Sequence, residues 1–391
     1  MKISEVTPFL LRGHERYGSN DRGGEATDQG DWLLLVRVRT DDGLEAWSDV
    51  ETLGPVAARV INGTGMSALG FRTIAAEIVG RALGDLTEIW DELFIATAYY
   101  GRRGVAMHCM SAIDNCLWCL RAQGQGLSLA TLLGGARRSE VPAYASTLFR
   151  MTPEDNASAA RTYVDQGFRG AKFGWGGFGL DPGLDAENLA AVSEVLGPDC
   201  RLMVDPGWYV DDGGTARIRS ASETATMLDT LTLVEPYWVE DFVHPECTED
   251  YVAWKRRYPG LRFAAGEQQA TIWELRRLVR SGGIDVVQPD LSRCGGLTVA
   301  TQLIPDAFEL DVEIVTHSWL TDLLHAYSLS YLAALPRASW VEFNVAQSEL
   351  TRGVVQKRMS LSPQGSVAVP ESPGIGVEID LSFVQSRAVA L

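Results

Sequence analysis

Six short apolar runs decide the fold of this chain: LMVDPGW (202–208), YWVEDF (237–242), FAAGEQQ (263–269), VVQPDLSRCGG (286–296), EIVTHSW (313–319) and WVEFNV (340–345). Each run carries a residue able to bind a metal or move a proton, namely Asp205, Glu240, Glu267, Asp290, His317 or Glu342. These residues are 35, 27, 23, 27 and 25 positions apart, which is about one strand–helix unit each time. Because the strand C-termini of a parallel barrel open onto one face, the pattern predicts that the six side chains meet there, as in an enzyme.

The texture of the chain changes near residue 136. From there to about residue 345, strand-like and helix-like segments alternate, which predicts a parallel sheet, and about eight strands favour a closed barrel over an open sheet. Earlier, the turn Thr40-Asp41-Asp42-Gly43 predicts a hairpin, and residues 68–135 have helical periodicity. We therefore expect an α+β domain over 1–135, a barrel over 136–365, and a segment over 366–391 that packs back on the first domain.

Length and charge narrow the classes of function. The chain has 391 residues, more than the ~250–300 at which a single core stops growing. Its net charge of −17 argues against a nucleic-acid partner, although an anionic small molecule could bind beside a divalent metal. No run reaches the ~18–20 apolar residues of a membrane span, and MKISEVTPFLLRG does not resemble a signal peptide. We expect an enzyme of the cytoplasm that acts on a small molecule.

Asp205, Glu240 and Glu267 form the candidate metal site. Taken singly, each could be a helix cap or the partner in a surface ion pair. Three carboxylates held together would repel one another and raise their own pKa values unless a positive charge lay among them. Oxygen ligands select a hard cation, so the sequence predicts Mg²⁺, with Mn²⁺ as its main competitor.

Asp290 and His317 form the candidate acid/base pair. In a barrel, an aspartate one strand–helix unit before a histidine lies close enough to accept the proton on Nδ1. This bond would fix the tautomer, raise the basicity of the ring and leave Nε2 facing the cavity. Glu342, at the next strand end, could donate a hydrogen bond to substrate as a desolvated, protonated acid, or it could be a surface glutamate.

Segments along nearly the whole chain resemble the mandelate racemase/muconate lactonizing enzyme-like members of the enolase superfamily, and among them the mandelate racemase subgroup. They are VPAYAST, GFRGAKFG, VDPGW, WVEDF, GEQ, QPDLSRCGG, THSW, VEF, the helical SAIDNCLWCLRAQGQGLSLATLLGG and the tail PGIGVEID. The resemblance implies an α/β fold, a modified (β/α)₇β TIM-type barrel with an N-terminal α+β capping domain, and one Mg²⁺ per site. By position it implies metal ligands Asp205, Glu240 and Glu267, a general-base dyad of Asp290 and His317, and Glu342 as the stabiliser of an enediolate.

Two positions depart from the family pattern. The family's second barrel strand usually carries Lys-x-Lys, whereas GAKFGWG offers Lys172 and then Gly174 in place of the second base. By resemblance, Lys172 contacts the substrate carboxylate. Racemisation needs a proton donor on each face, so one histidine favours elimination of water, and Trp175 either walls the opposite face or packs between barrel and helix. The second departure is Gly207, where many relatives have an asparagine.

The resemblance also suggests where substrate contacts lie. The loop over residues 14–30 should fold over the barrel mouth, which makes Tyr17 and Arg22 candidate substrate contacts, together with the segment 99–103 and Trp319 beside the histidine. Loop arginines suit carboxylate recognition, although for any single one the more common role is that of a solvated surface arginine. Family analogy suggests a homo-oligomer, either a dimer or an octamer.

The favoured function is Mg²⁺-dependent dehydration of a sugar acid to a 2-keto-3-deoxy acid, which makes the protein a hydro-lyase. A second interpretation is an isomerase of the same superfamily, either a sugar-acid lactone cycloisomerase or an epimerase. A third is a non-catalytic binding protein on the same fold, which the six filled site positions disfavour. A nucleotide enzyme is poorer still, because no phosphate-loop motif follows any strand.

Overall fold

The computed structural model describes the chain from residue 1 to residue 391 except for residues 15–30, 65, 212–215 and 346–347. Within the described part, eight parallel strands form one sheet in the order β12-β11-β10-β9-β6-β5-β4-β13. They are β4 (Glu140–Leu148), β5 (Gly170–Gly174), β6 (Arg201–Asp205), β9 (Trp238–Glu240), β10 (Phe263–Ala265), β11 (Val286–Val287), β12 (Glu313–Ile314) and β13 (Val341–Asn344).

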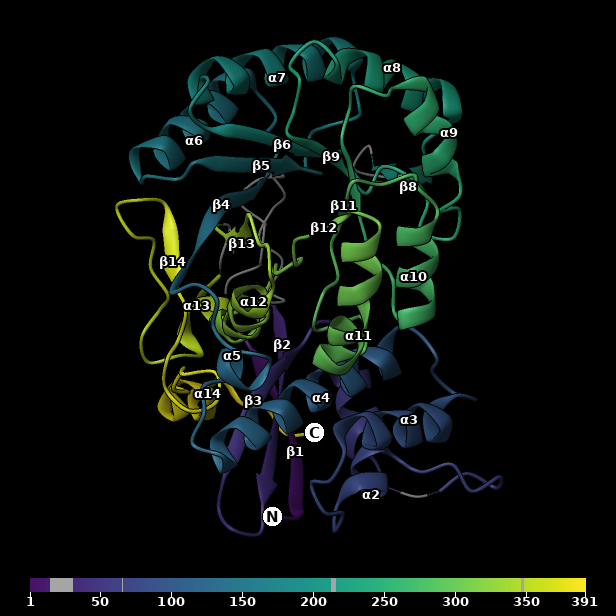
Figure 1. The fold of residues 1–391 in the computed structure, drawn as a ribbon, viewed down its shortest axis with the longest axis vertical. Helices are drawn as coiled ribbons and strands as arrows, with labels where there is room; N and C mark the ends of the chain where they lie inside the picture. The colour runs from purple at the N-terminus through teal and green to yellow at the C-terminus, as the bar shows by residue number, and fades with distance from the viewer. Residues whose placement is uncertain (15–30, 65, 212–215, 346–347) are drawn as a thin grey trace.

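A helix follows each of the first seven of these strands along the chain. They are α6 (Pro153–Asp165), α7 (Pro182–Leu196), α8 (Ala221–Leu231), α9 (Asp250–Arg257), α10 (Ile272–Arg280), α11 (Gly296–Glu309) and α12 (Asp322–Ala334). Figure 1 shows the strands curving inside this outer row of helices. A small hairpin of β7 (Tyr209–Asp211) and β8 (Ala216–Ile218) interrupts the alternation after β6. The topology confirms the predicted modified (β/α)₇β barrel.

The seam of the barrel lies between its last two strands, because β12 and β13 end the hydrogen-bonded path of the sheet. A hydrogen bond crosses this seam above the strands, where the Ser318 amide donates to Oε2 of Glu342 at 2.5 Å. The Glu342 carboxylate of β13 therefore also holds the segment that follows β12, the other edge strand.

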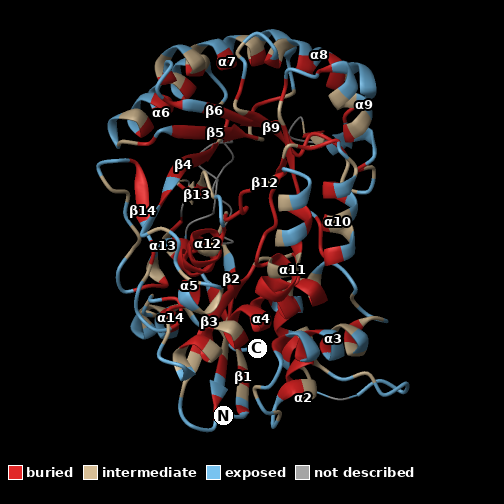
Figure 2. Cartoon of the chain, in the orientation of Figure 1, coloured by how far each residue is buried: buried red, intermediate tan, exposed pale blue. Residues whose placement is uncertain are grey.

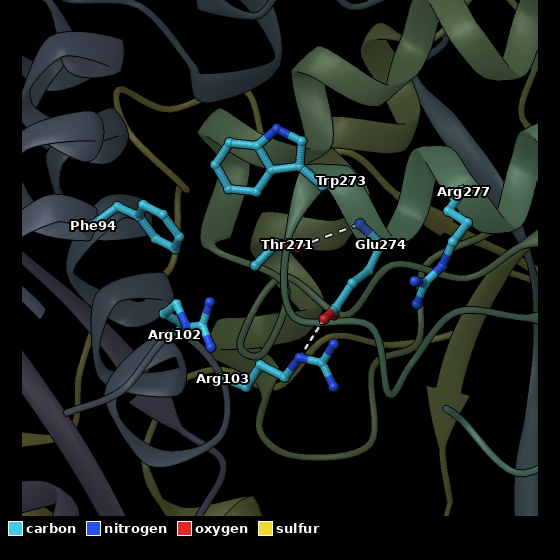
Figure 3. A pocket seen from close by; sticks show the side chains of 7 residues that line it. All are labelled: Phe94, Arg102, Arg103, Thr271, Trp273, Glu274 and Arg277. Atoms are coloured by element: carbon cyan, nitrogen blue, oxygen red, sulfur yellow. Dashed lines mark hydrogen bonds and ion pairs between the residues drawn. The ribbon is translucent and has the colours of Figure 1, made fainter. Parts of the chain in front are cut away.

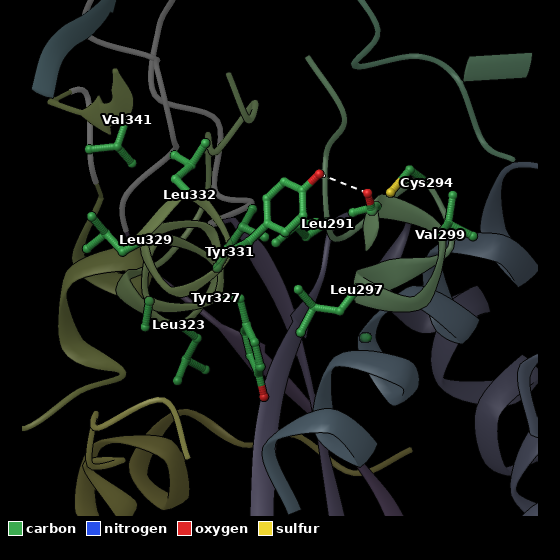
Figure 4. Packing of buried hydrophobic residues seen from close by; sticks show 14 of the residues in the cluster. Leu291, Cys294, Leu297, Val299, Leu323, Tyr327, Leu329, Tyr331, Leu332 and Val341 are labelled. Carbon is green, nitrogen blue, oxygen red and sulfur yellow. Dashed lines mark hydrogen bonds between the residues drawn. The ribbon is translucent and has the colours of Figure 1, made fainter. Parts of the chain in front are cut away.

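Aromatic and aliphatic side chains fill the barrel interior below the site. Tyr144, Met203 and Trp238 are fully buried there with Ala264, Val286 and Val315. The interior is therefore a packed core rather than a pore, as in other barrels of this size. A second layer of apolar residues lies between strands and helices, and Figure 2 shows that the outer helices are buried on their strand-facing side. Figure 4 shows part of that layer, where Tyr331 donates its hydroxyl proton to Ala300 O at 2.8 Å.

The N-terminal domain combines a three-stranded antiparallel sheet with helices, which confirms the predicted α+β cap. The sheet contains β1 (Ile3–Arg12), β2 (Trp32–Thr40) and β3 (Glu45–Val50). Its predicted hairpin turns at Gly43, whose φ of +94° a side chain would strain. The helices are α1 (Gly54–Asn62), α2 (Ile74–Ile78), α3 (Leu86–Thr97), α4 (Val105–Gly124) and α5 (Leu129–Leu132).

Helix α4 holds the cap against the loop between β11 and α11. Asp114 accepts hydrogen bonds from the amide and the hydroxyl of Thr298 at 2.8 and 2.6 Å. Asn115 accepts from the Leu297 amide at 3.1 Å and donates to Leu291 O at 2.9 Å. These buried bonds cap the start of α11 from another domain. The clamp formed by Asp114 and Asn115 therefore fixes the loop that contains Asp290.

The end of the chain returns to both domains. Strand β14 (Ser366–Ala368) pairs antiparallel with β4, and helices α13 (Glu349–Gly353) and α14 (Leu381–Arg387) lie on either side of it in the sequence. Beyond α14, the Val389 amide donates to Leu10 O at 2.9 Å, so the tail adjoins β1. The domain boundaries at residues 135 and 365 stay predictions. In the described residues, no helix is both long and apolar enough to cross a membrane.

Candidate active site

The three predicted metal-binding carboxylates converge at the C-terminal end of the barrel. Asp205 and Glu240 are the last residues of β6 and β9, and Glu267 follows β10 by two residues. One carboxylate oxygen from each lies within 4.8 Å of the others, and all three side chains are buried. Residues separated by 62 positions thus meet because their strands are neighbours in a parallel sheet.

The electrostatics of this cluster fit a divalent cation. Burial raises the pKa of Asp205 well above its usual range, and the charges of Glu240 and Glu267 raise it further. Burial also raises the pKa of Glu240, although Lys172 opposes the shift. Three buried carboxylates whose oxygens converge on one point are the donor set that a hard cation takes. These residues would hold the Mg²⁺ predicted from the sequence.

Neighbouring side chains fix how the carboxylates point. Trp238 Nε1 and Gln288 Nε2 donate to Oε2 of Glu240 at 2.9 and 2.8 Å. Trp175 Nε1 donates to Oδ2 of Asp205 at 2.9 Å. The sequence analysis did not assign Trp238 or Gln288, although both lie within two residues of a strand end.

The structure brings Asp290 and His317 together as a hydrogen-bonded pair. His317 Nδ1 lies 2.6 Å from Asp290 Oδ2, and the two residues also form a parallel β-bridge. Ser292 holds the other carboxylate oxygen, with its amide at 2.6 Å and its hydroxyl at 2.7 Å from Oδ1. Burial opposes ionisation of Asp290, but the bond to His317 and the charge of Arg293 lower its pKa to about 2. Asp290 is therefore a fixed anion that orients the ring.

The outer nitrogen of His317 points into the carboxylate cluster, where Nε2 lies 3.0 Å from Oε2 of Glu267. Burial alone would lower the pKa of the imidazole, but Glu267 and Glu342 reverse the effect and raise it well above its usual range. Nε2 therefore faces the site, at the position from which a base would reach a substrate held there.

Arg293 and Glu51 are site residues that the sequence analysis missed. The Arg293 guanidinium lies 3.3 Å from Oε1 of Glu267 and 3.6 Å from Oδ2 of Asp290, and it also pairs with Glu51. Glu51 follows β3 of the cap directly. One arginine therefore ties a predicted metal ligand, the general-base dyad and the cap to one another. In the sequence, the position of Arg293 three residues after Asp290 is the feature that could have indicated its place in the site.

Lys172 and Glu342 form a second buried ion pair. Lys172 Nζ lies 2.8 Å from Oε1 of Glu342 and 2.5 Å from Oε1 of Glu240. Glu342 also accepts from the Ser146 hydroxyl at 2.6 Å and from the Ser318 amide. Burial raises the pKa of Glu342, yet Lys172 and His317 outweigh it and lower the pKa below its usual value. This set of donors favours the carboxylate, in contrast to the protonated acid expected from the sequence.

The side of the cavity that lacks a second base is closed by packing. A Cβ atom at Gly174 would lie 2.9 Å from the Asp205 Cβ, and one at Gly207 would lie 2.6 Å from the Trp175 ring. Both Trp175 and Gly207 have positive φ, +44° and +62°. The indole therefore occupies the space that a side chain at 207 would need. The two departures from the family pattern are parts of one arrangement around Trp175.

The structure gives a different result for each of the other predicted substrate contacts. Tyr17 and Arg22 lie outside the described residues. Trp319 is half-buried, two residues after His317. In the segment 99–103, the Tyr100 hydroxyl donates to Arg72 O at 3.0 Å, and Arg103 pairs with Glu246 and Glu274 rather than with a residue of the carboxylate cluster.

Comparisons with known proteins match the whole architecture. The model of the mandelate racemase/muconate lactonizing enzyme N-terminal domain matches residues 25–134, and the enolase C-terminal domain-like model matches residues 155–383. D-galactarolactone cycloisomerase of Agrobacterium fabrum is 29% identical over 359 residues, which cover 89% of each chain. L-rhamnonate dehydratase of Saccharopolyspora erythraea is 26% identical, with 89% of this chain and 83% of that protein covered. The crystal structure of 3,6-anhydro-D-galactonate cycloisomerase from Zobellia galactanivorans shares the fold, with a TM-score of 0.85 at 23% identity over 100% of both chains.

Proposed function

The chain belongs to the mandelate racemase/muconate lactonizing enzyme family of the enolase superfamily, and from this premise we propose that it dehydrates a sugar acid to a 2-keto-3-deoxy acid. The domain matches confirm the family predicted from the sequence and make the protein an enzyme of that superfamily. The observation that carries the proposal is the single acid/base group, because His317 has no counterpart at Gly174 across the cavity.

The proposed reaction uses His317 twice. Nε2 first takes the proton α to the substrate carboxylate, while Asp290 stabilises the imidazolium that forms. The same proton then goes to the β-hydroxyl as its C–O bond breaks, so that one water leaves and the enol product tautomerises to the 2-keto acid. Lys172 supplies positive charge beside the carboxylate on which negative charge develops. Such elimination needs no base at position 174.

The three carboxylates Asp205, Glu240 and Glu267 would hold the divalent cation. When bound there, the cation would supply Lewis acidity that makes the α-proton of the substrate more acidic. The protein's own part is to keep the ligands oriented through Trp175, Trp238 and Gln288, and to hold His317 at the edge of the cluster.

A lactone cycloisomerase is the second candidate, favoured by the 29% identical relative of that name. Its chemistry would begin with the same proton abstraction by His317. The leaving group would then be an oxygen that stays attached to the product, so no water would be lost. Homo-oligomer formation and a cytoplasmic location stay predictions.

The test is a screen of mono- and diacid sugars, and of their lactones, with purified protein and Mg²⁺. We expect formation of a 2-keto acid that is lighter than its substrate by one water, and its loss after chelation of the metal. A product with the mass of its lactone substrate would favour the cycloisomerase. Turnover that is unchanged after exhaustive chelation would overturn the proposed metal site.

A further inference from the structure

A hollow of about 500 Å³ lies at the junction of cap and barrel, outside the carboxylate cluster. Phe94 of α3 and the turn with Arg102 and Arg103 before α4 line its cap side. Trp273, Glu274 and Arg277 of α10 line its barrel side, and Figure 3 shows these side chains arranged around the space. None of these residues belongs to the proposed reaction.

The charge of this hollow is opposite to that of the chain. Three arginines line it, although the net charge of the protein is −17. Arg103 is engaged by Glu246 and Glu274. For Arg102 and Arg277, the described part of the structure contains no hydrogen bond or ion pair, so their guanidinium groups are available to a ligand. Planar guanidinium groups bind carboxylate or phosphate oxygens in pairs.

An aromatic wall completes the hollow. The Trp273 side chain is 56% exposed, which is unusual for the largest apolar residue, and its ring lies 5.2 Å from that of Phe94. Trp90 stacks behind Phe94 at 5.2 Å with an interplanar angle of 8°. Trp273 meets Phe94 of this stacked pair at a tilt of 45°, and its exposed indole can take a flat group of a ligand.

We propose that this hollow binds a small organic anion that carries two or more negative charges beside a flat ring. Arg102 and Arg277 bind the anionic oxygens, and the ring lies against Trp273. The anion can come from carboxylates or from phosphates, which share the recognition chemistry. Because the hollow has one wall in each domain, the bound anion also strengthens the contact between cap and barrel. This inference does not depend on the proposed reaction.

The test is calorimetric titration of the full-length, Mg²⁺-loaded protein at low salt with three probes. Benzene-1,3,5-tricarboxylate and adenosine diphosphate offer a ring with carboxylates or phosphates, whereas pyrophosphate has no ring. We expect binding of one ring-containing anion per chain, at least about tenfold tighter than pyrophosphate. Preference for either ring-containing probe identifies the anionic group.

Variants of the chain distinguish binding in the hollow from nonspecific attraction between opposite charges. The Arg102→Ala/Arg277→Ala variant should weaken binding by at least about tenfold, because it removes the charge-assisted hydrogen bonds of two guanidinium groups. The control Arg59→Ala/Arg161→Ala removes two exposed charges elsewhere and should leave binding within about twofold. Trp273→Ala should weaken the ring-containing probes but not pyrophosphate. Absence of binding, equal losses in both double variants, or binding retained in the first would overturn the proposal.

Discussion

The two sides of the active-site cavity are built in opposite ways. On the His317 side, titratable groups are linked in a chain that runs from the cap residue Glu51 through Arg293 to Asp290 and the imidazole. On the Gly174 side, Gly174 packs against Asp205 and Gly207 packs against the Trp175 ring. The absence of a second base therefore involves more than the exchange of one lysine for Gly174. A side chain at position 174 would displace Asp205, and a side chain at position 207 would displace the indole.

Replacing His317 should have the largest effect, because it removes the group proposed to take the α-proton. We expect His317→Asn to lower turnover by about 10²–10⁴-fold and to abolish exchange of the α-proton with deuterated water. Mass spectrometry of the recovered substrate measures the exchange, and Mg²⁺ affinity serves as the control for an intact site. Exchange at near the wild-type rate would place a second base in the cavity, with Lys172 as the first candidate.

Replacing Asp290 should have a smaller but still large effect. The Asp290→Asn variant keeps the shape of the side chain but loses the charge that fixes the tautomer of His317 and stabilises its protonated form. Turnover should fall by about 10²-fold, whereas α-proton exchange should remain measurable. The ratio of exchange to product formation in one assay tests this order of events. A variant as inactive in exchange as His317→Asn would show that the aspartate is needed for the first proton transfer.

The cap end of the same chain should contribute less. Glu51 pairs with Arg293, which in turn faces Glu267 and Asp290, so Glu51 is a positioning residue. We expect Glu51→Gln to lower kcat by about tenfold with little change in KM, because the arginine keeps its charge but loses its anchor. Glu51→Asp should restore part of the rate. An equal rise in KM with unchanged kcat would instead place Glu51 among the substrate contacts.

The Gly174 side can be tested through Gly207, and the chain offers a matched control. Gly207 and Gly197 both have a φ of +62°, but a Cβ at 207 would lie 2.6 Å from the Trp175 ring, whereas one at 197 would meet open space. Gly197→Ala should therefore cost only the backbone strain, about 1–3 kcal/mol. Gly207→Ala should cost about 1–3 kcal/mol more from the forced shift of the indole. Equal losses in urea unfolding would show that the indole moves freely.

Much of the site could be predicted because it follows strand order. Asp205, Glu240 and Glu267 end or follow apolar runs, and parallel strands bring such positions to one face whatever their distance in sequence. The dyad of Asp290 and His317 was predictable for the same reason, and the structure pairs them. The α+β cap was predictable from its hairpin turn and its helical periodicity.

Other features depend on contacts that no periodicity encodes. Glu51 reaches the site because the cap docks on the barrel, and no spacing within residues 1–135 shows that docking. The charge state of Glu342 depends on Lys172, Ser146 and Ser318, which come from three different segments. Arg103 was expected at the substrate but pairs with Glu246 and Glu274 instead, since its orientation is set by the fold of the turn before α4.

The smallest effect on turnover should come from the clamp between α4 and α11, which supports the His317 side from outside. Burial raises the pKa of Asp114 to about 7, although its bonds from Thr298 oppose the shift. A folded-state pKa above the unfolded value of about 3.9 means that protonation stabilises the fold. This contribution is fully present below the unfolded pKa and is lost as the pH rises through about 7. In Asp114→Asn the contribution is absent, so the variant's free energy of unfolding should vary less with pH between about 4 and 7. Urea titrations of both proteins across that range measure the difference, and parallel curves would show that Asp114 is charged throughout in the folded protein.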